Sequence, residues 1–178
     1  MSKYTALLEE KLGATYPKLA ALNNEKLNNF LGEWIELCNP DSVFMADDSD
    51  EDAEFIRQRS LELGEEKQMA RENVTMHYDG VKDQARDKGN TKYLVNEDRL
   101  ADMGKLNCLG LQAGMTEVKE IMKDIMVGKM AYVKLFCEGP TQSPFAIGCA
   151  QITDSCYVAH SEDILYRRGY QQFATMEN

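Results

Sequence analysis

The chain has 178 residues, of which 43% are hydrophobic and 8% aromatic. That is enough for a globular protein with a hydrophobic core and excludes a disordered chain. The formal net charge is −10, from 30 acidic and 20 basic residues. Contacts to nucleic-acid phosphates need clustered Lys and Arg, so this charge argues against a nucleic-acid partner.

Two amphipathic helices are expected at the N-terminus. Leucines recur at helical spacing over residues 7–12, and a continuous apolar stripe runs over residues 27–38. Because the residue before a proline is disfavoured in a helix, Asn39-Pro40 predicts the end of the second helix.

A short β-prone run at 42–46 precedes a third expected helix. Ser49, followed three residues later by Asp52, resembles a capping box and predicts a helix that reaches Gly64.

Two strand candidates, 74–78 and 92–95, flank the segment 79–91. This segment is polar, charged and bounded by glycines, which is typical of a mobile or functional loop.

In the second half, an apolar stripe over 118–126 predicts a helix capped by Thr116 at its start and ended by Gly128. Three β-rich segments are expected to follow, at 130–137, 145–152 and 156–160. Ser161 is expected to cap a last helix that carries Ile164, Leu165 and Phe173.

The predicted elements favour an α/β fold in which a mixed β-sheet is flanked by helices. We expect residues 1–178 to form a single domain, with a helical opening at 1–38 and a mixed α/β part at 39–178.

Several motifs fail on inspection. Asp48, Asp50 and Asp52 alternate as in a calcium loop, but Ala53 and Arg59 stand where the loop requires Gly and Glu. We therefore expect a solvated acidic helix start. No phosphate-binding glycine loop is found.

His77 and His160 are the only histidines and lack zinc-site spacing, so we expect each to be a half-buried polar residue. The five cysteines contain no CxxC pair, which argues against disulfides and structural zinc, and Cys137 and Cys149 are expected to be inert thiols. No apolar run reaches the roughly 18 residues that a membrane span needs. Together with the absence of a targeting signal, this predicts a cytoplasmic protein without membrane contact.

Residues 129–169 carry a string of motifs that resembles the N-terminal domain of phosphoenolpyruvate carboxykinase of the GTP-using type and its diphosphate-using relatives. The matching features are Gly139-Pro140, Ser143-Pro144, Thr153-Asp154-Ser155, a Tyr157-Val158 strand and Arg168-Gly169. Residues 38–52 resemble the Cys-x-Pro-Asp strand and acidic turn of that family, with Asp48 where Gly is usual. Residues 160–170 are closer to the diphosphate-dependent branch.

The resemblance implies that Arg86 matches a substrate-binding arginine of the family. Without the resemblance, Arg86 would be expected to form only weak surface ion pairs with its neighbours Asp83 and Asp87. The family interconverts oxaloacetate and phosphoenolpyruvate with GTP or diphosphate and divalent Mn or Mg. Its phosphate loop and metal ligands have no counterpart here, so no catalytic, metal or cofactor residue is assigned.

The expected function is the substrate-side portion of such an enzyme, inactive alone and needing a C-terminal catalytic portion or another subunit. The alternatives are a non-catalytic relative acting as a binding or assembly subunit and, third, a dicarboxylate-binding module that uses Arg86.

Overall fold

The computed structural model describes residues 2–80, 87 and 89–176, and statements on structure refer to these. Its elements are α1 (Thr5–Leu12), η1 (Gly13–Thr15), α2 (Tyr16–Leu22), α3 (Glu25–Cys38), β1 (Ser42–Met45), α4 (Asp50–Glu62), β2 (Lys67–Gln68), β3 (Thr75–Met76), β4 (Tyr93–Val95), η2 (Glu97–Met103), β5 (Cys108–Gly110), α5 (Leu111–Met122), β6 (Met130–Glu138), β7 (Ile147–Thr153), α6 (Cys156–Leu165), β8 (Arg167–Arg168) and α7 (Tyr170–Thr175).

A mixed four-stranded sheet confirms the predicted α/β class. Strand β6 lies at its centre, parallel to β1 and antiparallel to β7 and β8. The strand β7 pairs with β6 alone, so it forms one edge of the sheet within the described residues.

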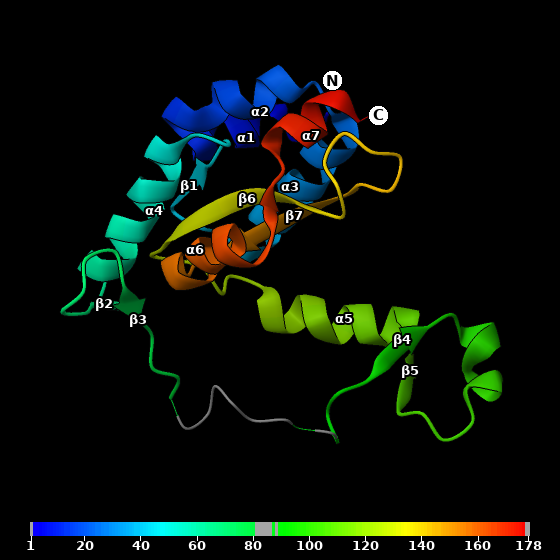
Figure 1. Ribbon diagram of the computed structural model, residues 1–178. Helices are drawn as coiled ribbons and strands as arrows, with labels where there is room; N and C mark the ends of the chain where they lie inside the picture. Colours follow the sequence, from blue (N-terminus) through cyan, green and yellow to red (C-terminus); the bar gives the residue numbers. More distant parts are fainter. Residues whose placement is uncertain (1, 81–86, 88, 177–178) are drawn as a thin grey trace.

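Helices cover both faces of this sheet (Figure 1). Because side chains alternate along a strand, Val133 and Leu135 of β6 pack into the core made with α1, α2 and α3. Tyr132 points to the opposite face, where it packs with Ile56 of α4 and Cys156 of α6.

The helix α3 confirms the prediction from the stripe at 27–38. Its start is capped by the Asn24 side chain, which accepts the N–H of Leu27 at 2.8 Å. It ends at Asn39, which adopts a left-handed conformation (φ 53°) directly before Pro40.

The helix α4 begins at Ser49 as predicted, since the Ser49 hydroxyl accepts the N–H of Asp52 at 3.3 Å. The reciprocal half of a capping box is missing. The Asp52 carboxylate instead accepts the N–H of Asp47 at 2.8 Å and pairs with Lys18 of α2. Asp52 is buried, so the expectation of a solvated acidic start is wrong for this residue.

The helix predicted between Thr116 and Gly128 is displaced. The helix α5 starts at Leu111 and ends at Met122, and the Thr116 hydroxyl donates within it to the carbonyl of Gln112 at 2.9 Å. Beyond α5, the chain turns at Asp124 (φ 56°). There the N–H groups of Asp124 and Met126 bond the carbonyls of Leu37 and Cys38 at the end of α3, each at 2.9 Å. These hydrogen bonds to the end of α3 take the place of hydrogen bonds that would have continued α5, so the helix stops at Met122.

The predicted strand at 156–160 is wrong, because these residues begin α6. Ser155 caps that helix by accepting the N–H of Val158 at 3.2 Å. Ser161 therefore lies inside α6 and caps nothing, and its hydroxyl donates to the carbonyl of Tyr157 at 2.8 Å. The last helix is α7, which includes Phe173.

Strands β3 and β4 confirm strand structure within 74–78 and 92–95. The strand β4 pairs in parallel with β5, and together with η2 they form a lobe beyond α5, set apart from the central sheet (Figure 1). No helix among residues 2–80, 87 and 89–176 is long and apolar enough to cross a membrane.

Candidate functional site

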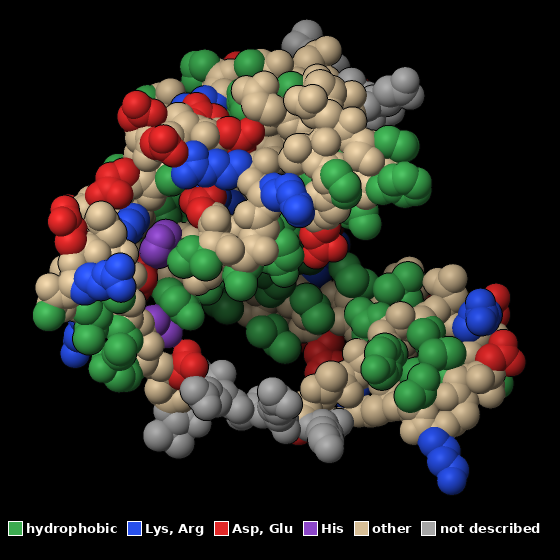
Figure 2. Space-filling view, viewed as in Figure 1, with side chains coloured by type: hydrophobic (Ala, Val, Ile, Leu, Met, Phe, Trp, Pro, Cys, Tyr) green, Lys and Arg blue, Asp and Glu red, His purple; other side chains and the backbone are tan. Residues whose placement is uncertain are grey.

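Arg86, the residue expected to bind substrate, lies outside the described residues, as does most of the segment 79–91. The described residues of this segment are Asp79 and Gly80 on one side and Asp87 and 89–91 on the other. Figure 2 shows the surface hollowed between the main body and the lobe of β4, β5 and η2, with hydrophobic side chains along its inner wall. The two histidine side chains show as separate patches on the main body, on the side away from this lobe.

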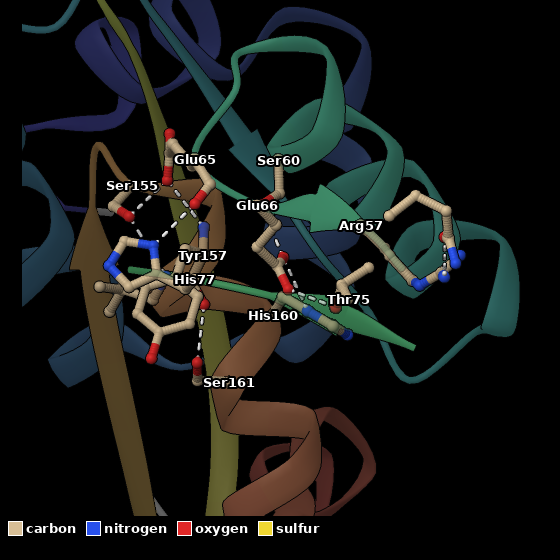
Figure 3. Close-up of polar contacts among 12 residues, drawn as sticks. Arg57, Ser60, Glu65, Glu66, Thr75, His77, Ser155, Tyr157, His160 and Ser161 are labelled. Atoms are coloured by element: carbon tan, nitrogen blue, oxygen red, sulfur yellow. Dashed lines mark hydrogen bonds and ion pairs between the residues drawn. The ribbon is translucent and has the colours of Figure 1, made fainter. Parts of the chain in front are cut away.

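The two histidines, distant in sequence, lie in two neighbouring polar networks around Glu65 and Glu66, made by the end of α4, the β2–β3 hairpin and α6 (Figure 3). The ring of His77 stacks on Tyr157 of α6, with centroids 3.7 Å apart and planes 10° from parallel. His77 Nδ1 lies 2.7 Å from the carbonyl of Glu65, which can only accept, so Nδ1 carries the proton. Its Nε2 faces Asp79 at 3.3 Å.

Glu65 caps the start of α6. One of its carboxylate oxygens accepts the Ser155 hydroxyl at 2.6 Å and the N–H of Tyr157 at 2.8 Å. A carboxylate at a helix N-terminus satisfies a backbone donor and interacts favourably with the helix dipole. Glu65 therefore ties the end of α4 to α6.

Glu66 is buried in the neighbouring network, with 5% of its surface exposed. It accepts the hydroxyls of Ser60 and Thr75, each at 2.6 Å, and lies 3.0 Å from His160 Nδ1. Burial alone would raise the pKa of Glu66, but the hydrogen bonds from Ser60 and Thr75 and the nearby His160 outweigh it and lower that pKa.

This arrangement indicates a clamp that holds three elements together. Because donors surround the Glu66 carboxylate, it has little freedom to act as a general base. His77 and His160 are half-buried polar side chains, 24% and 15% exposed, as predicted from the sequence. Among the described residues, no group of three His, Cys, Asp or Glu side chains is placed to hold a metal ion.

A third polar network joins β6, α6 and the start of α4. Lys134 of β6 is buried and lies 2.9 and 3.1 Å from the two carboxylate oxygens of Asp163. Arg168 approaches Asp163 at 3.7 Å, and donates at 2.8 Å to the Asp50 carboxylate and to the Asp48 carbonyl.

Asp48 explains one departure from the family pattern. Its two carboxylate oxygens accept the N–H groups of Tyr170 and Gln171 at 2.9 and 2.8 Å, at the start of α7. A glycine at this position would leave these donors without that partner.

The remaining family motifs lie around β6 and β7. Gly139-Pro140 and Ser143-Pro144 belong to the loop that joins these strands, and Thr153-Asp154-Ser155 joins β7 to α6. Gly139 has φ +76°, a conformation suited to glycine. The expected hairpin is therefore confirmed, while Tyr157-Val158 is helical.

The thiols among the described residues are free, and burial raises the pKa of Cys149 and Cys156. A raised pKa disfavours the thiolate, which is the reactive form. This agrees with the expectation of an inert Cys149.

The fold defines a mixed α/β unit that carries the carboxykinase-type motifs, and the comparison with known proteins assigns its family. The family profile for the phosphoenolpyruvate carboxykinase N-terminal domain matches residues 29–178. The chain belongs to this family.

Several curated relatives carry the name phosphoenolpyruvate carboxykinase [GTP], and three of them illustrate the match. The protein from Thermococcus sibiricus is 49% identical over 158 residues, covering 89% of this chain and 25% of the relative. The one from Pyrococcus furiosus is 43% identical over 97% of the chain and 28% of the relative. The protein from Saccharolobus solfataricus is 38% identical over 88% of this chain and 25% of the relative. The chain thus spans about a quarter of the length of these relatives.

Proposed function

We propose that this chain is the N-terminal, substrate-side portion of a GTP-dependent phosphoenolpyruvate carboxykinase, which interconverts oxaloacetate and phosphoenolpyruvate. The match of the family profile to 29–178 is the observation that supports this most directly. The relatives named for GTP favour GTP over diphosphate as the phosphoryl donor. A closer likeness of 160–170 to the diphosphate-dependent branch stays a prediction.

Arg86 is the residue proposed to touch substrate. A guanidinium binds a carboxylate or phosphate through two parallel hydrogen bonds and stays charged at neutral pH. The competing interpretation pairs Arg86 with its acidic neighbours. The Asp87 carboxylate accepts the N–H groups of Gly89 and Asn90, at 3.0 and 3.1 Å, and the choice of an anionic substrate as the partner of Arg86 rests on the family resemblance.

The phosphoryl-transfer machinery is proposed to lie in a C-terminal catalytic portion or another subunit. Transfer from GTP requires divalent metal ions, Mn or Mg by family resemblance, and groups that stabilise the charge of the moving phosphoryl group. We therefore expect the chain by itself to be inactive, and the complete protein to work in the cytoplasm.

Calorimetry tests the role of Arg86. Oxaloacetate and phosphoenolpyruvate are titrated into the wild-type chain, Arg86→Ala and the matched control Arg71→Ala, whose side chain lies exposed at the β2–β3 turn. Loss of a charge-assisted contact is expected to weaken binding by about 10- to 100-fold in Arg86→Ala only. Equal heats in all three proteins would remove Arg86 as the anchor.

Turnover tests the wider proposal. The chain is fused to the three quarters of the Thermococcus sibiricus relative that the match leaves uncovered, and conversion of oxaloacetate with GTP and Mn²⁺ is assayed. We expect activity in the fusion and none in the chain alone. Binding of oxaloacetate without any turnover in a folded fusion would favour the dicarboxylate-binding module.

A binding or assembly subunit is the second candidate, because large apolar side chains lie on the surface. Phe145 is 78% exposed, Ile164 72% and Ile121 65%. A contiguous patch of such side chains would mark a surface that another protein covers, so this candidate requires that they act as one surface. Light scattering that finds a clean monomer at all concentrations would argue against self-assembly.

A further inference from the structure

We propose that the outer edge of β7 receives a β-strand from the polypeptide that accompanies this domain in its longer relatives. The inference rests on the proposed function, because it takes those relatives as the guide to what the complete protein contains. It adds a specific interface, formed through backbone hydrogen bonds, that the family assignment does not define.

The direction of the backbone groups of β7 follows from those of β6. The carbonyls of Val133 and Leu135 accept the N–H groups of Ala46 and Gly169, at 3.1 and 3.0 Å, on the side of β1 and β8. Since backbone groups alternate in direction along a strand, the even-numbered residues of β6 turn theirs toward β7.

The register then shows which residues of β7 face outward. The even-numbered residues of β6 lie opposite Ile147, Cys149, Gln151 and Thr153. The N–H and C=O groups of these four residues therefore form hydrogen bonds with β6. The N–H and C=O groups of the three intervening residues, 148, 150 and 152, point away from the sheet. Among the described residues, no hydrogen bond to these outward groups is found.

Within the part of the chain that the structure describes, no strand pairs with this edge, and β7 itself has no lysine or proline to protect it. The strand β7 is seven residues long, IGCAQIT, with no charged residue and no proline. Proteins commonly shield sheet edges with lysine, proline, bulges or a covering segment, because an open edge pairs with other chains. An unprotected edge of this length is therefore suited to receive a strand.

An apolar groove lies beside the edge and suits alternate side chains of an added strand. One hollow of about 270 Å³ is lined by Phe30, Trp34, Cys38, Met122, Met126 and Ile152. A neighbouring hollow of about 390 Å³ shares Phe30 and includes Gly148, Ala150 and Phe173. Because Gly148, Ala150 and Ile152 lie on this face of β7, a strand beside them would place every second side chain over the groove.

The length of the relatives identifies the occupant. This chain matches only 25% of the Thermococcus sibiricus protein, so three quarters of that protein lies outside the matched region and could supply the added strand. The groove calls for an extended segment with apolar side chains at alternate positions. A second copy of this chain is the competing occupant.

Amide hydrogen exchange distinguishes these cases in three samples: the chain at low concentration, the chain at high concentration, and the fusion to the remainder of the Thermococcus sibiricus protein. In the dilute chain, we expect fast exchange at Gly148, Ala150 and Ile152 and slow exchange at Cys149 and Gln151. In the fusion, the three outward amides are expected to slow by about 100-fold or more.

Two variants test the backbone contact directly. Ala150→Pro removes an outward N–H while leaving the bonds of its neighbours to β6, and Ala150→Ser keeps the N–H. In the fusion, we expect Ala150→Pro to restore fast exchange at Gly148 and Ile152 and Ala150→Ser to leave it slow. Both should keep the circular dichroism of the wild-type chain.

Fast exchange of the outward amides in a folded fusion would overturn the proposal. So would slowing that appears with concentration in the chain alone, which would assign the edge to a second copy. If the fusion does not fold, the strand aligned with β7 in the whole Thermococcus sibiricus protein gives the decision by the same measurement. Amide exchange can be measured without any turnover. Its result therefore tests the strand pairing independently of the activity and oxaloacetate-binding tests of the proposed function.

Discussion

Lys134 and Asp163 form an ion pair inside the protein, with Nζ 2.9 Å from one carboxylate oxygen and side chains only 3% and 12% exposed. The pair joins the central strand β6 to α6, so it connects the sheet with the helix that carries Tyr157 and His160. Breaking such a pair is costly, because the remaining charge is buried without its partner.

Lys134→Met tests this contact. We expect the free energy of unfolding, measured with urea, to fall by about 3 kcal/mol or more, because Asp163 keeps only the more distant Arg168. Replacing both members, Lys134→Met with Asp163→Leu, should recover most of the loss. The matched control is Lys119→Met, whose partner Glu33 is 47% exposed and whose expected cost is about 1 kcal/mol or less. Equal costs for the two single variants would contradict the buried character of the first pair.

Acid stability should depend on Asp47. Burial by itself raises the pKa of Asp47, but hydrogen bonds from Ser49 and the ion pair with Lys18 outweigh it and lower that pKa from 3.8 to about 2. A carboxyl whose folded-state pKa is lowered stabilises the protein fully above the unfolded-state value, and this contribution is lost as the pH falls through the folded-state value.

Asp47→Asn is therefore expected to lower the free energy of unfolding at pH 7. It should also reduce the loss of stability between about pH 4 and pH 2, measured by urea unfolding at each pH. Asp98→Asn, on the exposed segment η2, serves as the control and should follow the wild-type curve. An unchanged pH profile in Asp47→Asn would show that Lys18 and Ser49 do not hold the charge of Asp47.

Glu66→Gln probes the clamp between α4, the β2–β3 hairpin and α6. The amide oxygen of Gln can still accept from Ser60 and His160, but the other oxygen, which accepts the Thr75 hydroxyl, becomes an NH2 group and the negative charge is lost, so charge-assisted hydrogen bonds become weaker neutral ones. We expect a cost of about 1–3 kcal/mol in thermal unfolding. Glu54→Gln, at a side chain 56% exposed, should change stability little. An unchanged melting temperature in Glu66→Gln would contradict the proposal that the Glu66 carboxylate holds the clamp together.

Gly169 should not tolerate a side chain. A Cβ at this position would lie 2.5 Å from the backbone carbon of Phe136, which cannot move without disturbing β6. Gly169→Ala is therefore expected to cost about 2 kcal/mol or more. At Gly89, the nearest atom to an added Cβ is the Asp87 side-chain oxygen at 3.3 Å, so Gly89→Ala is the mild control. Comparable melting temperatures for the two variants would contradict the close approach of Gly169 to β6.

Elements with a local signal were predicted correctly from the sequence. The stripe at 27–38 gave α3 because a helix needs one apolar face, and Ser49 gave the start of α4 because its hydroxyl satisfies a free N–H. The strands at β1, β6 and β7 were also found, since β-branched and aromatic runs between turn residues are typical of strands.

The errors occur where distant residues supply the backbone partners. The buried residues of α6 are Cys156, Ala159 and Glu162, which are spaced as on one face of a helix. This spacing could have indicated α6, but the β-prone residues of 156–160 favoured a strand. Glu65, about ninety residues earlier, accepts the N–H of Tyr157 and favours the helix. Likewise, α5 ends before Gly128 because the N–H groups of Asp124 and Met126 bond carbonyls at the end of α3.

The candidate site shows the same division. The sequence by itself determined the family and the α/β class, because those depend on residue types at fixed spacing, while substrate binding by Arg86 stays a prediction. Only the tertiary structure brought His160 to Glu66, buried Lys134 against Asp163 and left the outer backbone groups of β7 without a partner among the described residues. Such relationships depend on contacts between residues far apart in the chain, and local propensity contains no information about which distant donor meets which acceptor.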